Sequence, residues 1–431
     1  MITREQAVEA AHRWVNGALP PEGVRPVLSH EFDLGWVVWP EPPPIQIDPL
    51  TGERRAPEEI GAACAVVDRV TGELTVWPSV PVGEVIRLYR DRLGAGSYNP
   101  VLPPVTGPGT RATLTYRGKE GAEQTLAVDS ELGLPHPALR AWQRLREQGV
   151  AAEDVLGLHT DLRLGMLPGG YWAYVIGSQL PEVPVGYDLA HGPHFDQRAA
   201  AVRALDGRRE RGGLPPMNRV PFPAAVPPAQ PEPAAALAAR LAERFGPDGV
   251  RRFDPAAVAD ADLPEAVAGP LLDLGLPRTV EGFFSLHHPE PDGVADGTAD
   301  GTVLPDLAGH LAALGRGERA TAEARKALLG QLLIGTDGWA LITVDTAQGR
   351  VRAVDPDYAT ARYCNTDLTA FIRCLALFAE RYPRLRGLDP QTAGPAVAEL
   401  QWALAALDRT VFSDPENWWA VIVEQLWCGL L

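Results

Sequence analysis

The side chains of this sequence that could do chemistry are few. His136 stands in LPHPALRAW, where a proline follows it and apolar spacing predicts a helix from about Pro137 to Gln148. His287 and His288 are neighbours, so on a strand they would face opposite sides and could not share a metal ion. His136, at a predicted helix start, is the histidine whose role as a metal ligand has to be considered.

Two other patterns are weaker still. The aspartates of DGVADGTADG have a four-residue spacing but no glutamate to complete a calcium loop, so we interpret the stretch as a linker: Asp292, Asp296 and Asp300. The four cysteines form no CxxC pair, which argues against a zinc ribbon or a disulfide framework. The chain also has no GxSxG, GxxxxGK[ST], HExxH or GxGxxG motif. We expect no cofactor and no metal.

His136 could serve a zinc deaminase only with the right partners. That chemistry needs a histidine and two cysteines as zinc ligands, and a glutamate two residues after the histidine to move protons. Ala138 stands at the glutamate position. The stretch LRLGMLPGGYWAYVI then precedes a second predicted helix, and it resembles the nucleic-acid/nucleotide deaminase domains of bacterial polymorphic toxin systems.

The resemblance covers about Val101–Gly213 and implies which positions should carry the cysteines. The family motif runs Pro-Cys, Leu-Pro-Gly, Tyr-Cys, which places its cysteines at Gly165 and Trp172. The rest of the motif matches at Leu167, Pro168, Gly169 and Tyr171. With three of the four chemical groups replaced, we predict an inactive, degenerate deaminase-like domain whose metal cavity is filled by Trp172.

Strands and helices alternate through this middle segment. TRATLTYRG and QTLAVD are predicted to form a hairpin. The predicted elements of this segment follow a β-α-β-α-β order. The pattern predicts a three-layer α/β domain at residues 101–213.

The first segment predicts a small α+β domain at residues 1–98. Thr3 and Gln6 have capping-box spacing at the start of a helix, and GWVVW, AACAVVD and LTVW read as strands. Gly72 falls in the turn of VVDRVTGEL. With Trp14 and Tyr89, these features resemble the immunity protein 35, or YrhB-like, family over about Met1–Leu93.

The last segment, residues 234–431, predicts a second α+β domain. IGTDGWALITVDTAQGRVRAVDP and YCNTDLTAFIRCLALFAERY resemble the fourth group of the SUKH superfamily of immunity proteins, through Gly338, Asp345, Gly349, Val351, Asn365, Leu368 and Phe371. Asn365 or Thr366 could cap the following helix. In ENWWAVIVEQLWCGLL, the apolar residues have helical spacing typical of a core helix.

A proline-rich stretch, PPMNRVPFPAAVPPAQPEP, separates the last two segments. Proline removes backbone donors and disfavours a preceding helix, so we expect an extended linker at residues 214–233. The chain as a whole is thus expected to be multidomain. It begins with no apolar signal core and has no long apolar run, which indicates a cytoplasmic protein without a membrane span.

The formal net charge of −16 disfavours nucleic acid and anionic membranes as partners. Both flanking resemblances imply an immunity protein that binds and neutralises a polymorphic toxin, a nuclease or deaminase, without catalysis. The acidity suggests that the protein toxin is cationic. Our candidate contact residues are Asp337, Asp355 and Asp357, chosen as exposed acidic residues in loops.

Two alternatives stay open. One is a zinc-dependent deaminase with an atypical site, and the other is a scaffold or regulatory protein with no toxin partner. The toxin, the domain that binds it and the oligomeric state are not determined by these patterns.

Overall fold

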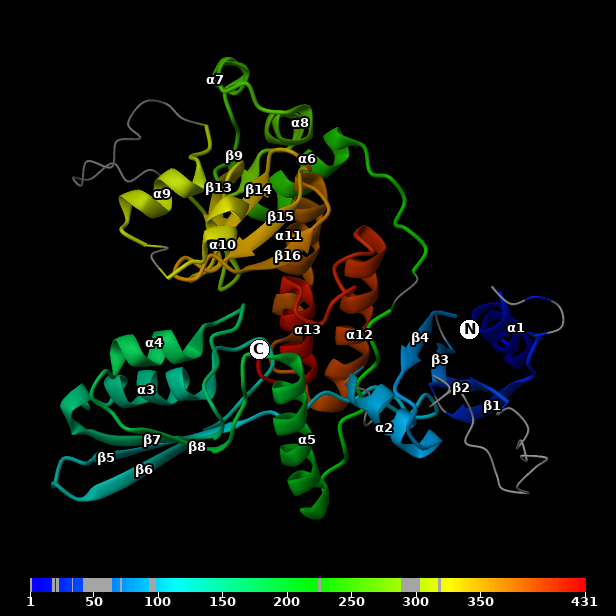
Figure 1. The fold of residues 1–431 in the computed structure, drawn as a ribbon. Coiled ribbons are helices and arrows are strands. Elements are labelled where there is room, and N and C mark those ends of the chain that lie inside the picture. Colours follow the sequence, from blue (N-terminus) through cyan, green and yellow to red (C-terminus); the bar gives the residue numbers. More distant parts are fainter. Residues whose placement is uncertain are drawn as a thin grey trace. The chain divides into compact units, whose positions relative to one another are not determined.

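The computed structural model describes residues 2–17, 20, 23–32, 34–41, 64–69, 72–92, 98–223, 226–287, 303–316 and 319–431. The chain divides into two compact units, Met1–Leu102 with Val220–Ala225, and Pro103–Arg219 with Val226–Leu431 (Figure 1). The Asp-rich stretch at 292–301 and His288 lie outside the described residues. Among the described residues, no helix combines the length and the apolar character needed to cross a bilayer.

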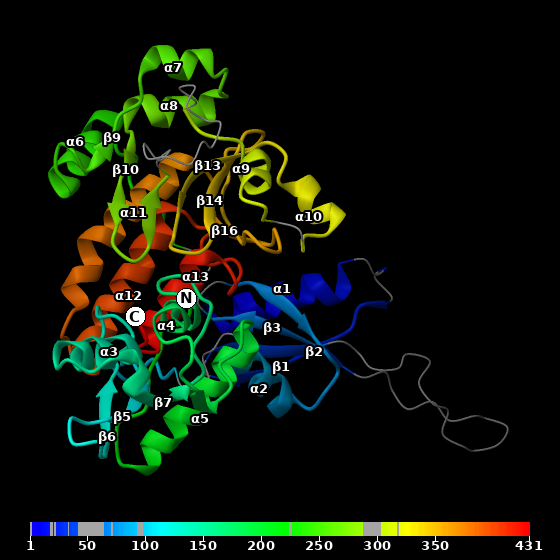
Figure 2. The same cartoon turned by 90° about the vertical axis from the view of Figure 1, so that its left-hand side faces the viewer.

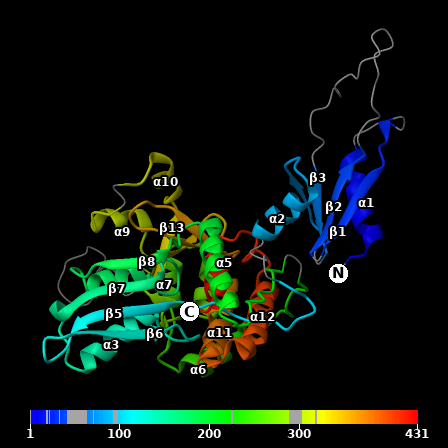
Figure 3. The same ribbon diagram turned by 90° about the horizontal axis from the view of Figure 1, so that it is seen from below.

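The first unit is an antiparallel sheet between two helices. Its strands pair in chain order: β1 (Val27–Phe32), β2 (Gly35–Pro40), β3 (Cys64–Asp68) and β4 (Leu74–Trp77). Alternate side chains of the strands point to opposite faces. One face packs against α1 (Arg4–Asn16) and the other against α2 (Val82–Arg92), as Figure 3 shows.

Two local predictions for this unit are confirmed. Thr3 and Gln6 form the capping box, with the backbone N–H of Gln6 donating to Thr3 Oγ1 and that of Thr3 donating to Gln6 Oε1. Gly72 has a φ of 71° and its N–H donates to the carbonyl of Asp68, as the β3–β4 turn requires. Strand β1 was not expected from the sequence.

The first half of the second unit holds a mixed four-stranded sheet. Its order is β6 (Glu123–Asp129), β5 (Arg111–Arg117), β7 (Val155–Leu162) and β8 (Val185–Leu189), with β7 and β8 parallel. The helices are α3 (Pro137–Glu147), α4 (Trp172–Gln179) and α5 (Phe195–Arg211). Leu114 and Leu158 of the sheet pack with Ala141 and Leu145 of α3 in one core.

The prediction of three layers for this half is wrong. Leu162 and Leu189, against which α5 packs, lie on the same sheet face as Leu158. The opposite face carries Thr113, Thr125 and His159, and no helix of the described residues covers it (Figures 1 and 3). Because that face presents polar side chains, it can stay in water and needs no second helical layer.

The second half of this unit is built on a six-stranded antiparallel sheet. Its strands are β11 (Thr279–Val280), β12 (Phe284–Leu286), β13 (Gln331–Thr336), β14 (Leu341–Asp345), β15 (Val351–Val354) and β16 (Ala361–Asn365). A short pair, β9 (Val250–Arg251) and β10 (Leu276–Pro277), lies beside it. The smaller helices are α6 (Ala234–Phe245), α7 (Pro255–Asp260), α8 (Glu265–Asp273), α9 (Leu307–Ala313) and α10 (Ala322–Ala327).

Three further helices, which pack against one another, complete this half. α11 (Leu368–Arg381), α12 (Pro390–Leu407) and α13 (Trp418–Trp427) pack side by side (Figures 1 and 2). All ten residues of α13 are buried, which confirms the prediction of a core helix. The predicted cap of α11 is wrong by a residue or two, because Asp367 accepts the N–H of Ala370 while Asn365 is buried and bonded to Asp408.

The predicted linker is only partly an extended connection. Its described residues include no helix, but Met217, Asn218 and Arg219 are buried. Asn218 forms an isolated antiparallel bridge with Val105. The stretch therefore begins inside the second unit, because it closes the core between the two halves.

Candidate functional site

His136 is the residue that caps α3. Its Nδ1 accepts the backbone N–H of Ala138 at 3.1 Å, and Pro137 occupies the first helical position. Burial, together with the nearby His191, lowers the pKa of His136 to about 3. The imidazole is therefore neutral at physiological pH, and Nδ1 is already used within the chain.

His136, Gly165 and Trp172 line the same small cavity, as their match to one motif implies. The cavity measures about 20 Å³, close to the volume that one water molecule needs. The rings of Trp172 and His136 lie 5.7 Å apart, and Trp172 also packs against the core beneath α3. The indole therefore occupies much of the space beside the imidazole.

His191 also lines this cavity and was missed by the sequence analysis. It is buried, and burial followed by the charge of Arg198 lowers its pKa to about 4. It lies in the loop after β8, so nothing in its sequence neighbourhood indicates that it faces His136. Its position depends on the fold of the whole half.

The donor set around the cavity does not fit zinc. Catalytic zinc takes three protein ligands from histidine, cysteine or carboxylate side chains, and the deaminase reaction also needs a glutamate. The cavity offers two neutral imidazoles, and the Ala138 methyl cannot carry a proton. Across the part of the chain that the structure describes, no three His, Cys, Asp or Glu side chains come together to hold a metal ion.

The turn between the two lost cysteine positions contacts the second half of the unit. The carbonyl of Pro168 accepts a 2.7 Å hydrogen bond from Gln425 Nε2. A Cβ at Gly169, which has a φ of 92°, would lie 2.7 Å from a methyl group of Leu431, so a larger residue would require that side chain to shift. Tyr171, which has a positive φ of 47°, donates its hydroxyl to Asp337 Oδ2 at 2.7 Å.

Asp337 is buried at this contact, so it is not the exposed residue that we expected. Its carboxylate accepts bonds from Tyr171, from Trp418 Nε1 and from the backbone N–H groups of Trp339 and Ala340. Burial raises its pKa, although these bonds oppose the rise. Asp337 is thus a structural acceptor and cannot reach a partner.

Asp355 and Asp357 are half-buried and largely engaged within the chain. Asp355 accepts the N–H groups of Asp357 and Tyr358, and also Nε1 of Trp339 at 3.1 Å. Asp357 pairs with Arg316 at 2.9 Å. These contacts within the chain stabilise the loop after β15, and they already engage both carboxylates.

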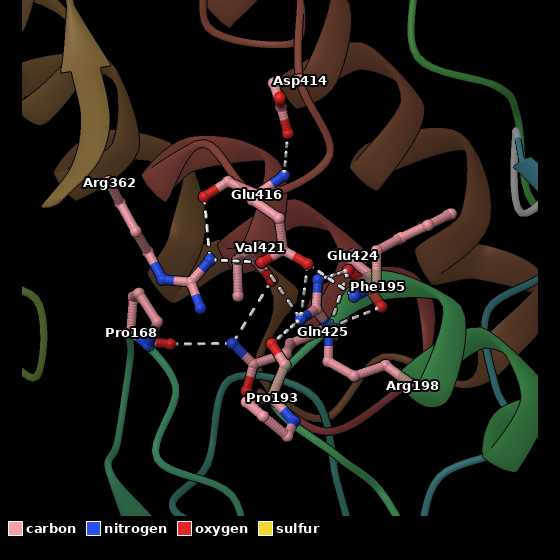
Figure 4. Close-up of polar contacts among 10 residues, drawn as sticks. All are labelled: Pro168, Pro193, Phe195, Arg198, Arg362, Asp414, Glu416, Val421, Glu424 and Gln425. Carbon is pink, nitrogen blue, oxygen red and sulfur yellow. Dashed lines mark hydrogen bonds and ion pairs between the residues drawn. The ribbon is translucent and has the colours of Figure 1, made fainter. Parts of the chain in front are cut away.

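A buried ion network joins α5 to α13 (Figure 4). The side chain of Arg198 is fully buried, and it contacts Glu424 at 2.8 Å and Glu416 at 3.3 Å. Glu416 also pairs with Arg362 of β16 at 2.5 Å. Burial raises the pKa of Glu416, but its bond with Arg362 and the charge of Arg198 lower it overall.

The C-terminal residues close the cavity from the other side. Gln425 and Leu430 line it, and Cys428 and Leu430 share an apolar cluster with Leu162 and Val202. The backbone adds further contacts, since Gly109 N–H donates to the carbonyl of Cys428 at 2.8 Å. The second half of the same unit therefore forms one wall of the cavity that His136 lines.

Family models of known proteins match three successive segments of the chain. Family models match at residues 5–97 (immunity protein 35-like domain), 107–207 (Xanthomonas-like deaminase) and 236–425 (SUKH-4 immunity protein). No curated protein and no solved structure shows significant similarity to the chain. The chain therefore joins an immunity protein 35-like domain, a deaminase-like domain and a SUKH-4 immunity domain, in that order.

Proposed function

We propose that this protein is a bacterial immunity protein that binds and neutralises a protein toxin, a nuclease or a deaminase, without catalysis. The observation that carries the proposal is the pair of immunity-protein domains at residues 5–97 and 236–425. Neutralisation by binding needs shape and charge complementarity but no catalytic group. We place the protein in the cytoplasm of the cell that it protects.

The small cavity supports the non-catalytic part of the proposal. A deaminase must bind a nucleobase next to an activated water, and this cavity of about 20 Å³ has room for one water molecule but not for a nucleobase as well. Gln425 and Leu430 of the second half are among the residues that line it. The deaminase-like domain instead packs against the SUKH-4 domain and stabilises it.

The distribution of charge supports a cationic partner. Residues 226–431 hold 28 Asp and Glu against 17 Lys and Arg, whereas residues 103–219 hold 13 of each. A positively charged toxin is therefore attracted most strongly to the SUKH-4 half, which carries most of the net negative charge. Nucleic acid and anionic membranes are repelled by the same field.

Co-expression with a toxin tests the proposal. The chain is produced with the toxin domain encoded by the adjacent gene, and growth is compared with that of cells that make the toxin alone. Restored growth, together with a purified toxin–chain complex, is the expected result. Undiminished toxicity and no complex would refute the immunity function.

A further inference from the structure

We propose that the toxin docks on an exposed aromatic and arginine surface where the deaminase-like and SUKH-4 halves meet. This surface, the seam patch, consists of Tyr174, Arg316, Trp339, Asp357 and Tyr358. The inference rests on the immunity function proposed above and names the part of the protein that carries it out. Of the three acidic contact residues that we expected from the sequence, only Asp357 belongs to it.

Both halves contribute side chains to the seam patch. Tyr174 lies on α4, and its ring centre is 5.1 Å from that of Trp339 in the β13–β14 turn. Trp339 in turn lies 6.5 Å from Tyr171, which makes the buried bond to Asp337. The patch is therefore the solvent-exposed continuation of the interface between the two halves.

The patch is partly exposed, and contacts within the chain hold its members together. Tyr174 and Tyr358 are each 50% exposed. The Arg316 guanidinium lies 5.0 Å from the centre of the Trp339 ring and also pairs with Asp357 at 2.9 Å. Trp339 Nε1 donates to Asp355, and Arg319 donates to the Tyr358 hydroxyl at 3.3 Å. These contacts hold the side chains in place before a partner arrives.

Such a surface is typical of a protein-binding site. Trp, Tyr and Arg are the residue types most enriched among those that dominate binding free energy. Side chains that are already fixed lose less conformational entropy on binding. Two half-exposed tyrosines beside a packed Trp–Arg pair therefore offer affinity at a low entropic cost.

The chemistry of the patch and its surroundings indicates a cationic protein surface as the occupant. The excess negative charge of residues 226–431 attracts such a surface to this half. The exposed ring of Tyr174 can then stack with a Lys or Arg side chain of that surface. At Tyr358, the Arg319 guanidinium already lies 5.8 Å from the ring centre, so a second cation could approach only the opposite ring face. The two arginines at the patch are accompanied by two carboxylates, since Arg316 pairs with Asp357 and Asp355 accepts the Trp339 indole N–H.

The test is a comparison of binding constants for two surface variants. The toxin domain encoded by the adjacent gene is titrated against the full chain, against Tyr174→Ala/Tyr358→Ala, and against Trp402→Ala as control. Trp402 is 38% exposed on α12, so its removal changes a comparable aromatic surface elsewhere in the same unit. We expect the double variant to raise Kd roughly tenfold or more and the control to change it by less than about twofold.

The possible outcomes separate this inference from the function on which it rests. If the wild-type chain binds and the double variant binds equally well, the seam patch is wrong and the immunity function stands. If the wild-type chain does not bind the toxin, the function itself fails. If the double variant only dissolves a dimer of the chain while toxin affinity is unchanged, the patch joins two copies and the inference is overturned. Thermal unfolding of each variant verifies that the fold is intact.

Discussion

The hydroxyl of Tyr171 donates a 2.7 Å hydrogen bond to the buried carboxylate of Asp337, which joins the deaminase-like domain to the SUKH-4 domain. Tyr171 belongs to the motif that would present zinc-binding cysteines in an active deaminase. Pro168 and Gly169 of the same turn also contact the SUKH-4 domain. The residues that match the deaminase motif therefore serve as an internal interface in this chain.

Removing the Tyr171 hydroxyl should weaken the unit. Tyr171→Phe leaves one acceptor position of buried Asp337 without its donor, so we expect unfolding to become about 1–3 kcal/mol easier. Tyr187→Phe is the control, because Tyr187 is 44% exposed and lies on the edge strand β8. Urea unfolding measures both, and equal stabilities of the two variants would contradict the structural role of the bond.

The buried arginine should matter more than an exposed one. Arg198→Met leaves Glu424 buried without its main partner, and we expect a loss of about 3–5 kcal/mol in unfolding free energy. Arg208→Met is the matched control on the same helix, since its pair with Asp188 is exposed and contributes about 0–1 kcal/mol.

A double variant tests whether the loss arises from an uncompensated charge. Adding Glu424→Gln to Arg198→Met should recover part of the stability, because the orphaned carboxylate is then gone. Additive losses from the two substitutions would show that the Arg198–Glu424 pair is not a coupled unit.

Glycine at the motif turn should be required for packing. Gly169→Ala combines a φ of 92° with a methyl group 2.7 Å from Leu431, so it should lower the unfolding midpoint. Gly177→Ala, in α4, meets nothing within 4 Å and should be neutral or stabilising by up to about 1 kcal/mol. An unchanged unfolding midpoint in Gly169→Ala would mean that neither the positive φ nor the Leu431 contact requires glycine at this position.

Acid should destabilise the second unit through two imidazoles. The pKa values of His136 and His191 are lowered to about 3 and about 4 in the folded state, below the unfolded value near 6.5. The unfolded chain therefore binds more protons in this range, so stability is complete above about pH 6.5 and falls as the pH drops towards 4.

A variant isolates this contribution from that of Asp337, whose raised pKa acts in the opposite direction. His136→Asn keeps a capping oxygen but cannot titrate, and His191→Gln removes the second imidazole. The unfolding free energy of the double variant, measured from pH 7 to pH 4, should decline less steeply than that of the wild type. Parallel curves would contradict the assignment.

The cavity should not hold zinc. Elemental analysis of the purified chain, before and after incubation with zinc and removal of excess metal, should give substoichiometric zinc. Ala138→Glu should produce no deaminase activity, because it restores a proton carrier but no thiolate ligands. About one zinc per chain, lost in His136→Ala, would revive the atypical-deaminase alternative.

Local patterns predicted local structure well in this chain. The Thr3–Gln6 capping box, the Gly72 turn and the buried helix α13 all follow from short-range spacing. The structure also brings His136, Gly165 and Trp172 to one cavity, while Ala138 is not among its lining residues. The motif specifies these positions relative to two adjacent helix starts.

What the sequence could not predict depends on contacts between distant segments. Asp337 lies in a polar turn, which predicts an exposed side chain. In the structure Tyr171 and Trp418, which are distant in the sequence, donate hydrogen bonds to its carboxylate and bury it. His191 joins the cavity only through the loop after β8. The uncovered face of the sheet formed by β5, β6, β7 and β8 could not be predicted either, because the alternation of strands and helices does not show which face each helix covers.

The most direct test of the account is the stoichiometry with which the purified chain inhibits the toxin encoded by the adjacent gene. Toxin activity is measured while the chain is titrated from well below to above equimolar amounts. Neutralisation by binding predicts inhibition that rises linearly and is complete at about one chain per toxin, unchanged in His136→Asn. Complete neutralisation at a small fraction of that amount, lost in His136→Asn, would show turnover and contradict a non-catalytic immunity protein.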